Sequence, residues 1–349
     1  MGLAPYRDTR YRIGPAIDIG CRLFRILRKI DRFSIAILVS VIVASLLPVS
    51  GMAAVWLGWI VKAAIALLFF LHGAKLSRAA ILSGLTSWKL HITVFLATFA
   101  LFPLLGLGAS ALAALFLPGI LATGFLFLTL LPSTVQSSIA FTSIARGNVP
   151  AAVCAASFSN FAGIFITPLL TALLIGARGA SGDTLASIEA IVVQLLLPFL
   201  AGHLSRPITA GFIDRHKALV GFTDRGSILL VVYAAFSAAV VDGLWRQIDP
   251  WQLAAIIALC CVLLALVLGI VAFTAHKAGF DRADRATILF CGSKKSLASG
   301  VPMAGVLFPA ALVGPVILPL MIFHQLQLLA CAAIAQHLST RHVSTHSDD

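Results

Sequence analysis

The sequence predicts an all-α polytopic membrane protein with ten transmembrane helices in two inverted five-helix repeats. Three observations predict this fold. Hydrophobic residues make up 60% of the 349 residues and charged residues only 11%, whereas soluble proteins have about 45–50% apolar and about 25% charged residues. Apolar runs of roughly the 20 residues needed to cross a bilayer recur along the chain. The basic residues collect in alternate loops.

Ten apolar runs follow one another with short breaks. They lie near 34–50, 54–72, 88–106, 110–146, 148–176, 186–204, 226–244, 251–274, 286–308 and 311–338, and the fourth and ninth are interrupted. Because each set contains an odd number of runs, the second set enters the membrane inverted relative to the first. The predicted units are a basic cytoplasmic N-terminal arm (1–33), a first repeat (34–176), a second repeat (177–338) and a cytoplasmic tail (339–349). We expect no signal peptide, with the first run acting as the insertion signal.

The basic residues predict the orientation. Twenty Lys and Arg residues fall in the arm, the tail and the even-numbered loops, and only Arg178 and Arg246 fall in the odd-numbered loops. Lys and Arg of short loops are retained in the cytoplasm, so both termini are expected there, in a protein of the cell inner membrane. This topology accounts for the net charge of +12, and nucleic acid is not an expected partner.

Both interrupted runs are rich in polar residues. In the fourth, LLPSTVQSSIAFTSIARGN, Pro132 breaks the helical hydrogen-bond ladder, and the ninth contains FCGSKKSLASGVP. Broken helices are tolerated in a bilayer only where protein or water satisfies the freed backbone groups. Two breaks at equivalent places in two repeats predict a binding site near the midplane. The candidate residues at the breaks are Pro132, Ser133, Thr134, Gln136, Ser137, Ser138, Gly292, Ser293, Lys294, Lys295 and Ser296.

Two adjacent lysines are the only charges expected at mid-membrane, because every acidic residue falls in a loop, a tail or the end of a run. Lys294 lies nine residues beyond Arg285, which is roughly 13 Å along a helix. We expect at least one of the two ammonium groups to face the protein interior. It would either pair with an anionic substrate at half-helix N-termini or occupy the place of a counter-cation. A snorkelling or hydrated lysine without a role is the third reading.

Further polar residues lie within the runs. Ser157 and Asn160 would share a helix face, Gln194 lies in the sixth run, and His324, Gln325 and Gln327 cluster in the tenth. For each of them, a hydrogen bond that holds helices together is the more frequent role. The cysteines lack metal-ligand spacing, and no HExxH, GxSxG or GxxxxGK[ST] motif occurs, so no enzyme and no cofactor are expected.

Several stretches resemble the bile acid:sodium symporter family, and most closely its SBF-like branch. They are Phe69–His91, Leu131–Asn148, Gln194–Pro207, Phe290–Pro302 and Leu318–Leu338, and the likeness extends from about residue 31 to the end of the tenth run. The resemblance implies a panel domain of helices one, two, six and seven, and a core domain of the other six with crossed discontinuous helices four and nine. It also implies transport of organic anions with sodium from a cavity between the two domains.

The resemblance also implies which residues occupy the sodium site. Ser137 and Ser138 match fourth-helix sodium ligands and are the candidate metal ligands here, while Phe290 stands at the place of a glutamate ligand. Lys294 and, approximately, Thr98 stand where the relatives have glutamine ligands. We therefore predict that the Lys294 ammonium supplies the charge that sodium supplies elsewhere. A uniporter, an exchanger or a carrier coupled to protons through a lysine or His324 would result, and Na⁺ or H⁺ coupling stays open.

The sequence as a whole predicts a secondary active transporter that moves an organic, anionic solute by alternating access. Its expected partners are a small-molecule substrate and the lipid bilayer, with no obligate protein partner. The alternative is a non-transporting membrane sensor or regulator that binds a ligand in the same cavity, and a channel is a third reading. The lysine hypothesis predicts that Lys294→Ala and Lys295→Ala abolish or strongly weaken substrate binding with folding intact.

Overall fold

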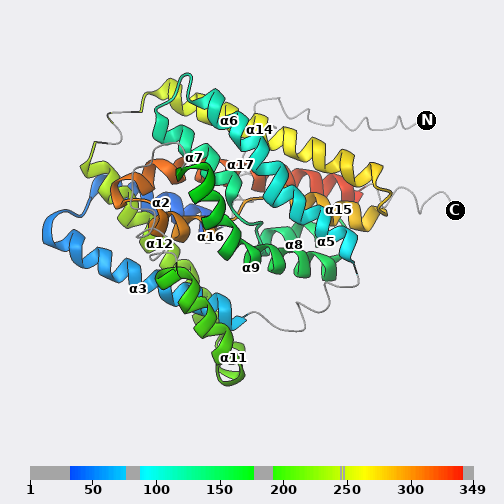
Figure 1. Cartoon of the computed structure of the whole chain (residues 1–349), viewed down its shortest axis with the longest axis horizontal. Helices are drawn as coiled ribbons and strands as arrows, with labels where there is room; N and C mark the ends of the chain where they lie inside the picture. The colour runs from blue at the N-terminus through cyan, green and yellow to red at the C-terminus, as the bar shows by residue number, and fades with distance from the viewer. Residues whose placement is uncertain (1–31, 76–86, 177–191, 244–245, 247, 341–349) are drawn as a thin grey trace, which may run out of the picture.

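The computed structural model describes residues 32–75, 87–176, 192–243, 246 and 248–340, and the ordered elements in these ranges are all helices. The expected arm, apart from its last two residues, lies outside the described residues, as do most of the tail and the start of the second repeat. Figure 1 shows the arrangement. The helices are α2 (Arg32–Leu46), α3 (Gly51–Lys75), α5 (Trp88–Leu96), the π-helix η1 (Ala97–Leu101), α6 (Phe102–Ala113), α7 (Gly119–Leu130), α8 (Gln136–Ile144), α9 (Val149–Leu174), the π-helix η3 (Val192–Leu196), α11 (Leu197–Arg215), α12 (Lys217–Val241), α14 (Pro250–Lys277), α15 (Arg282–Gly292), α16 (Leu297–Leu307) and α17 (Ala310–Thr340).

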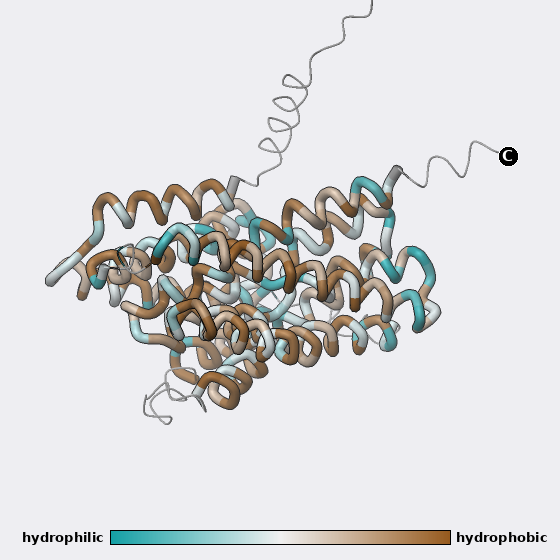
Figure 2. The backbone as a smooth tube through the Cα atoms, turned by 90° about the horizontal axis from the view of Figure 1, so that it is seen from above, coloured by the Kyte–Doolittle hydropathy of each residue, from teal (hydrophilic) through white to brown (hydrophobic). Residues whose placement is uncertain are grey.

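The chain is a multi-pass membrane protein. Within the described residues, six helices are long and apolar enough to cross a bilayer: 51–75, 88–113, 149–174, 217–241, 250–277 and 310–339. They correspond to six of the ten predicted runs. Phe33–Leu46 and Gly119–Leu130 are shorter apolar helices, and the predicted run 286–308 is divided between α15 and α16. Large apolar side chains such as Trp56, Trp59 and Leu204 point outward, and hydrophobic residues colour most of the tube in Figure 2.

Both predicted helix interruptions are confirmed. The chain leaves the helical conformation between α7 and α8 and again between α15 and α16. The first break follows from Pro132, because the residue before a proline is driven out of the α region, and Leu131 is extended with φ −77° and ψ 156°. At the second break, α15 ends at Gly292, and Ser296 caps the N-terminus of α16 by accepting a hydrogen bond from Ser299 N.

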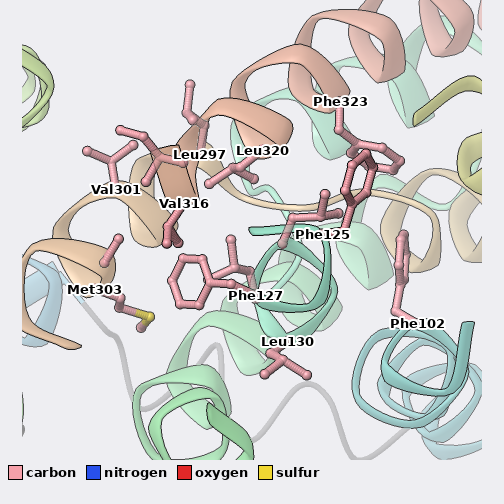
Figure 3. Close-up of a cluster of buried hydrophobic side chains, with 14 of the residues drawn as sticks. Phe102, Phe125, Phe127, Leu130, Leu297, Val301, Met303, Val316, Leu320 and Phe323 are labelled. Carbon is pink, nitrogen blue, oxygen red and sulfur yellow. The ribbon is translucent and has the colours of Figure 1, made fainter. Parts of the chain in front are cut away.

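The apolar core packs around the inner ends of the broken helices. Figure 3 shows the side chains of Phe125 and Phe127 from α7 facing those of Val316 and Phe323 from α17. These four side chains are fully buried. A Cβ on Gly124 would lie 2.6 Å from the carbonyl oxygen of Val316, so glycine is what lets the two helices approach so closely. This packing places the first break beside α17.

Helices α3 and α11 form a second closely packed pair, which Figure 1 shows extending away from the rest. A Cβ built on Gly73 or Gly202 would overlap a backbone carbonyl oxygen of the opposite helix, that of Phe199 or Phe70 respectively. The pair therefore depends on both glycines. Beyond it, the Lys75 ammonium forms an ion pair with Asp224 of α12.

Candidate functional site

The two breaks are joined directly by hydrogen bonds. The backbone N–H of Ser296 donates to the carbonyl of Pro132 (2.9 Å). The hydroxyls of Ser133 and Ser138 donate to the carbonyls of Cys291 (2.5 Å) and Phe290 (2.9 Å) at the end of α15. Each break thus satisfies backbone groups that the other releases, which is the condition for non-helical backbone at membrane depth.

Each of the four successive carbonyls at the end of α7, those of residues 130–133, accepts a hydrogen bond from another part of the chain. The Thr167 hydroxyl donates to Leu130 O (2.7 Å) and the Lys295 ammonium to Leu131 O (2.6 Å). Pro132 O receives the Ser296 N–H, and the Asn160 amide donates to Ser133 O (2.7 Å). The partners come from α9 and from the second break. Because buried carbonyls without partners are costly, these partners hold the break in one conformation.

Lys295 is coordinated like a bound cation. Its side chain is fully buried, and its Nζ donates to Thr98 O (2.8 Å) and to Leu131 O (2.6 Å). The Phe102 ring lies on a third side, with its centroid 4.2 Å from Nζ, which is a favourable cation–π distance. The carbonyl of Leu131 is at the C-terminal end of α7, where the helix dipole favours positive charge. Among the described residues no carboxylate forms an ion pair with this ammonium.

The carbonyl of Thr98 is available because the helix widens at η1. In an α-helix the N–H of Phe102 would bond to Thr98 O, four residues back, but here it bonds to Ala97 O. A π-helical partner for Thr98 O would be the N–H of residue 103. That residue is Pro103, which has no N–H. The widened turn and the proline together leave Thr98 O without a partner in its own helix. The Lys295 ammonium supplies the missing donor.

Lys294 is also fully buried but has weaker partners. Its Nζ lies 3.5 Å from the Ser137 hydroxyl, which is long for a hydrogen bond. Aromatic faces surround it instead, with Phe141 at 4.1 Å and Phe290 at 5.6 Å from Nζ to ring centroid. The reading of the lysines as snorkelling residues is wrong, because neither ammonium reaches the surface.

A glutamine that the predicted site did not include fixes the second break. The Gln327 carboxamide of α17 accepts from Lys295 N (2.9 Å) and donates to Lys295 O (2.8 Å), so it pairs with both backbone groups of one residue. Its Nε2 also lies 2.8 Å from His324 Nδ1. Helical spacing was the available signal, because His324 and Gln327 are three residues apart and share a face, whereas Gln325 points in another direction.

The other predicted residues divide into those at the breaks and those away from them. The Ser293 hydroxyl donates to Leu289 O (2.5 Å) at the end of α15. Gly292 lies close to η1, since a Cβ built on it would be 3.2 Å from the Cβ of Ala97. Thr134 hydrogen-bonds both Ser137 and Ser138. The remaining predicted residues form none of the hydrogen bonds described for this site: Gln136, which is exposed, and Ser157, Gln194 and Gln325, which are partly buried. On α9, Ser159 takes the place predicted for Ser157 and accepts from Ser133 N (3.0 Å).

The predicted metal ligands do not form a good cation site. Ser137 and Ser138 are neutral hydroxyls that already bond to Thr134 and to Phe290 O. The Lys294 ammonium beside Ser137 would repel a second cation, and no carboxylate of the described residues is present to offset the repulsion. The described residues also contain no group of three or more His, Cys, Asp or Glu side chains that could hold a metal. In this conformation the Lys294 ammonium therefore disfavours a sodium ion at these two hydroxyls.

Comparisons with known proteins identify the family. Residues 31–340 match the SBF-like CPA transporter family. The chain is 54% identical to an uncharacterized protein of Pseudomonas aeruginosa over 89% of this chain and 93% of that protein. It is 50% identical to an Escherichia coli protein provisionally named symporter YfeH, over 90% of this chain and 94% of that protein. Sodium/bile acid cotransporter 7 of Rattus norvegicus is 27% identical over 80% of this chain and 83% of its own length.

The Escherichia coli and Rattus norvegicus relatives are named as transporters rather than as enzymes. The family match covers the broken helices, the packed core and the paired helices α3 and α11 alike, because it extends over all the described residues. The chain therefore belongs to the SBF-like CPA transporter family, which is related to the sodium/bile acid cotransporters.

Proposed function

We propose that this protein is a secondary active transporter that carries an organic, anionic solute across the cell inner membrane by alternating access. In the proposed architecture ten helices form two inverted repeats, with both termini in the cytoplasm, and α3 and α11 belong to a panel that moves against a core. The contact between the two broken helices and the names of the relatives support this proposal. The substrate class comes from the family resemblance.

In this proposal a lysine replaces the bound sodium ion. The supporting observation is the coordination of Lys295 Nζ by Thr98 O and Leu131 O, two carbonyls from different helices. Backbone carbonyls of unwound helices are the groups that coordinate Na⁺ in secondary transporters. The hypothesis from sequence gave this task to Lys294. The contacts favour Lys295 as the tethered cation, with Lys294 as a second positive charge beside the hydroxyls of the first break.

The burial of both lysines favours one of the two roles considered for them. A substrate anion cannot contact either ammonium in this conformation, because both side chains are 0% exposed. The replacement of a counter-cation needs no exposure. We therefore infer that the lysines hold the two breaks together and that the substrate binds elsewhere, between the moving parts.

The decisive experiment measures transport by the purified full-length protein in liposomes. Radiolabelled organic anions, both sulfated and carboxylated, are offered with and without an inward sodium gradient. We expect exchange of at least one anion that is indifferent to sodium. A steep sodium dependence would contradict the lysine replacement. Ligand binding without any flux would instead support the sensor or regulator.

A matched pair of variants tests the second positive charge of this proposal, Lys294. Lys294→Gln removes the charge beside Ser137 and restores the residue type that the resemblance places there, so we expect exchange to fall or to become sodium-dependent. Lys62→Gln on α3 is the control, since Lys62 is exposed and lies over the Trp59 ring, 4.8 Å away. Equal exchange by both variants, without sodium dependence, would show that Lys294 has no part in coupling.

A further inference from the structure

One face of α11 lines an open hollow. His203, Arg206, Pro207 and Ala210 line this space, which has a volume of about 270 Å³. These residues are spaced i, i+3, i+4 and i+7 and therefore lie on a single helix face. The hollow is separate from the two breaks, because its lining residues share no contact described for the buried lysines.

The two basic residues of this face have unsatisfied nitrogen atoms. Arg206 Nε and His203 Nδ1 are both buried without a hydrogen-bond partner in the described part of the chain. No carboxylate of the described residues forms an ion pair with the Arg206 guanidinium. Arginine stays charged in proteins and offers five donors in a planar fork. A guanidinium that is charged, has no carboxylate partner among the described residues and keeps one nitrogen unpaired therefore lies beside a hollow that an anion can enter.

The His203 side chain lies beside neighbouring aromatic rings. Its imidazole stacks on Phe199, with an interplanar angle of 3° and centroids 6.5 Å apart. Phe199 in turn rests on Phe161 of α9, with centroids 5.9 Å apart. The histidine lies on the same face as the arginine, one helical turn away, because the two residues are three apart. Such pre-positioning lowers the entropic cost of binding a ligand.

The opposite face of α11 is suited to lipid acyl chains. Leu204, Ile208 and Phe212 follow one another at intervals of four residues and are 77%, 87% and 55% exposed. Figure 1 shows α11 extending from the rest of the molecule. An apolar stripe of this kind indicates that α11 contacts lipid, so phospholipid headgroups are among the phosphate groups that can reach the hollow.

We propose that Arg206 and His203 form a binding site for a phosphate group. The guanidinium fork donates two parallel hydrogen bonds to phosphate oxygens, and the imidazole N–H donates a third. The phosphate can belong to an anionic phospholipid headgroup or to free phosphate in solution, since the donors are the same for both. This site does not depend on the transport mechanism proposed above.

Native mass spectrometry of the full-length protein in a neutral detergent tests the site. The protein is titrated with phosphatidylglycerol, with phosphatidylcholine, and with inorganic phosphate at constant ionic strength. We expect phosphatidylglycerol or phosphate to bind the wild type, and Arg206→Gln to weaken that binding by about tenfold or more, the loss expected for charged hydrogen bonds. Binding of the lipid alone identifies the headgroup, and competition by inorganic phosphate identifies a soluble ligand.

Two further variants keep the test conclusive. Arg215→Gln, in the last turn of the same helix, removes an equal charge away from the hollow and is expected to bind as the wild type does. Arg206→Lys retains the charge without the fork and is expected to lie between the wild type and Arg206→Gln. The proposal is overturned if neither probe binds the wild type, or if Arg215→Gln loses as much binding as Arg206→Gln.

Discussion

Two neighbouring lysines with equal burial have unequal surroundings. Lys295 donates to two carbonyls and faces the Phe102 ring, whereas Lys294 has one distant hydroxyl and two aromatic faces. Consecutive residues of an irregular segment point in different directions, so each lysine enters a different environment. Lys295 is therefore held firmly by two hydrogen bonds, and Lys294 is held more weakly.

The two lysines are predicted to differ in their effect on stability. Lys295→Met leaves Thr98 O and Leu131 O without a donor, and each unsatisfied buried group costs about 1–3 kcal/mol. Lys294→Met removes a buried charge that has few partners, which is often neutral or stabilising. Thermal unfolding in detergent should therefore show a large loss for Lys295→Met and little or no loss for Lys294→Met. The predicted loss for Lys295 differs from the sequence-based expectation that Lys295→Ala folds intact. Equal losses for the two variants would contradict the predicted difference between the lysines.

At this scale the sequence predicted the charged residues better than their neutral partners. A lysine within an apolar run is conspicuous because charge in a bilayer is costly, and both lysines were selected on that ground. Gln327 and Ser159 were not selected, because a neutral polar side chain in a helix has many equivalent packing roles. Only the position of the opposite backbone shows that Gln327 pairs with both groups of Lys295.

At the scale of elements, the breaks are stabilised by side chains from unbroken helices. The long helices α9 and α17 supply Asn160, Thr167 and Gln327, which bond to the irregular backbone. The irregular segments are therefore fixed parts of the core. Pro132 predicted the first break, since a proline removes a donor wherever it occurs. The widening at η1 was not predicted, because Pro103 could equally begin a helix or bend one.

The amide of Gln327 is predicted to be essential for the conformation of the second break. Gln327→Leu leaves Lys295 N and O unsatisfied and should destabilise the fold by about 1–3 kcal/mol for each group. Gln325→Leu, two residues away on the same helix, is the control and should have little effect, because Gln325 makes no hydrogen bond to the break. Protection of the 293–296 backbone amides in hydrogen exchange measures the difference. Unchanged protection in Gln327→Leu would contradict the role.

The contact between α3 and α11 is predicted to tolerate no added side chain. Gly202→Ala would press its Cβ into the Phe70 carbonyl, and overpacking of this kind costs about 1–3 kcal/mol or more. Gly211→Ala on the same helix meets nothing within 4 Å and should be neutral or slightly stabilising, by up to about 1 kcal/mol. Melting temperatures of the two variants in one detergent compare them. A milder effect for Gly202→Ala than for Gly211→Ala would show that the helices separate readily.

At the scale of the whole molecule, composition and periodicity predicted a helical membrane protein because the bilayer permits few alternatives. Backbone groups in hydrocarbon must be satisfied internally, which favours helices. The number of spans was harder to obtain, since six described helices meet the requirements of length and composition and the others are short or divided. A span made of two short helices does not meet a criterion that requires one long, continuous helix. The inverted arrangement and the orientation remain predictions.

The attachment of a cation by covalent bonds has a consequence for the direction of transport. A sodium ion that is transported with the substrate cancels the charge of the substrate and contributes the energy of its own gradient. A lysine ammonium stays on the protein and does neither. If such a protein works as a uniporter, a monovalent anion that it carries moves as uncompensated current. An electrical difference of 100 mV, negative inside, would oppose its entry by about 2.3 kcal/mol, which is about fiftyfold in equilibrium concentration. The membrane voltage would then favour export of the anion by a uniporter of this kind.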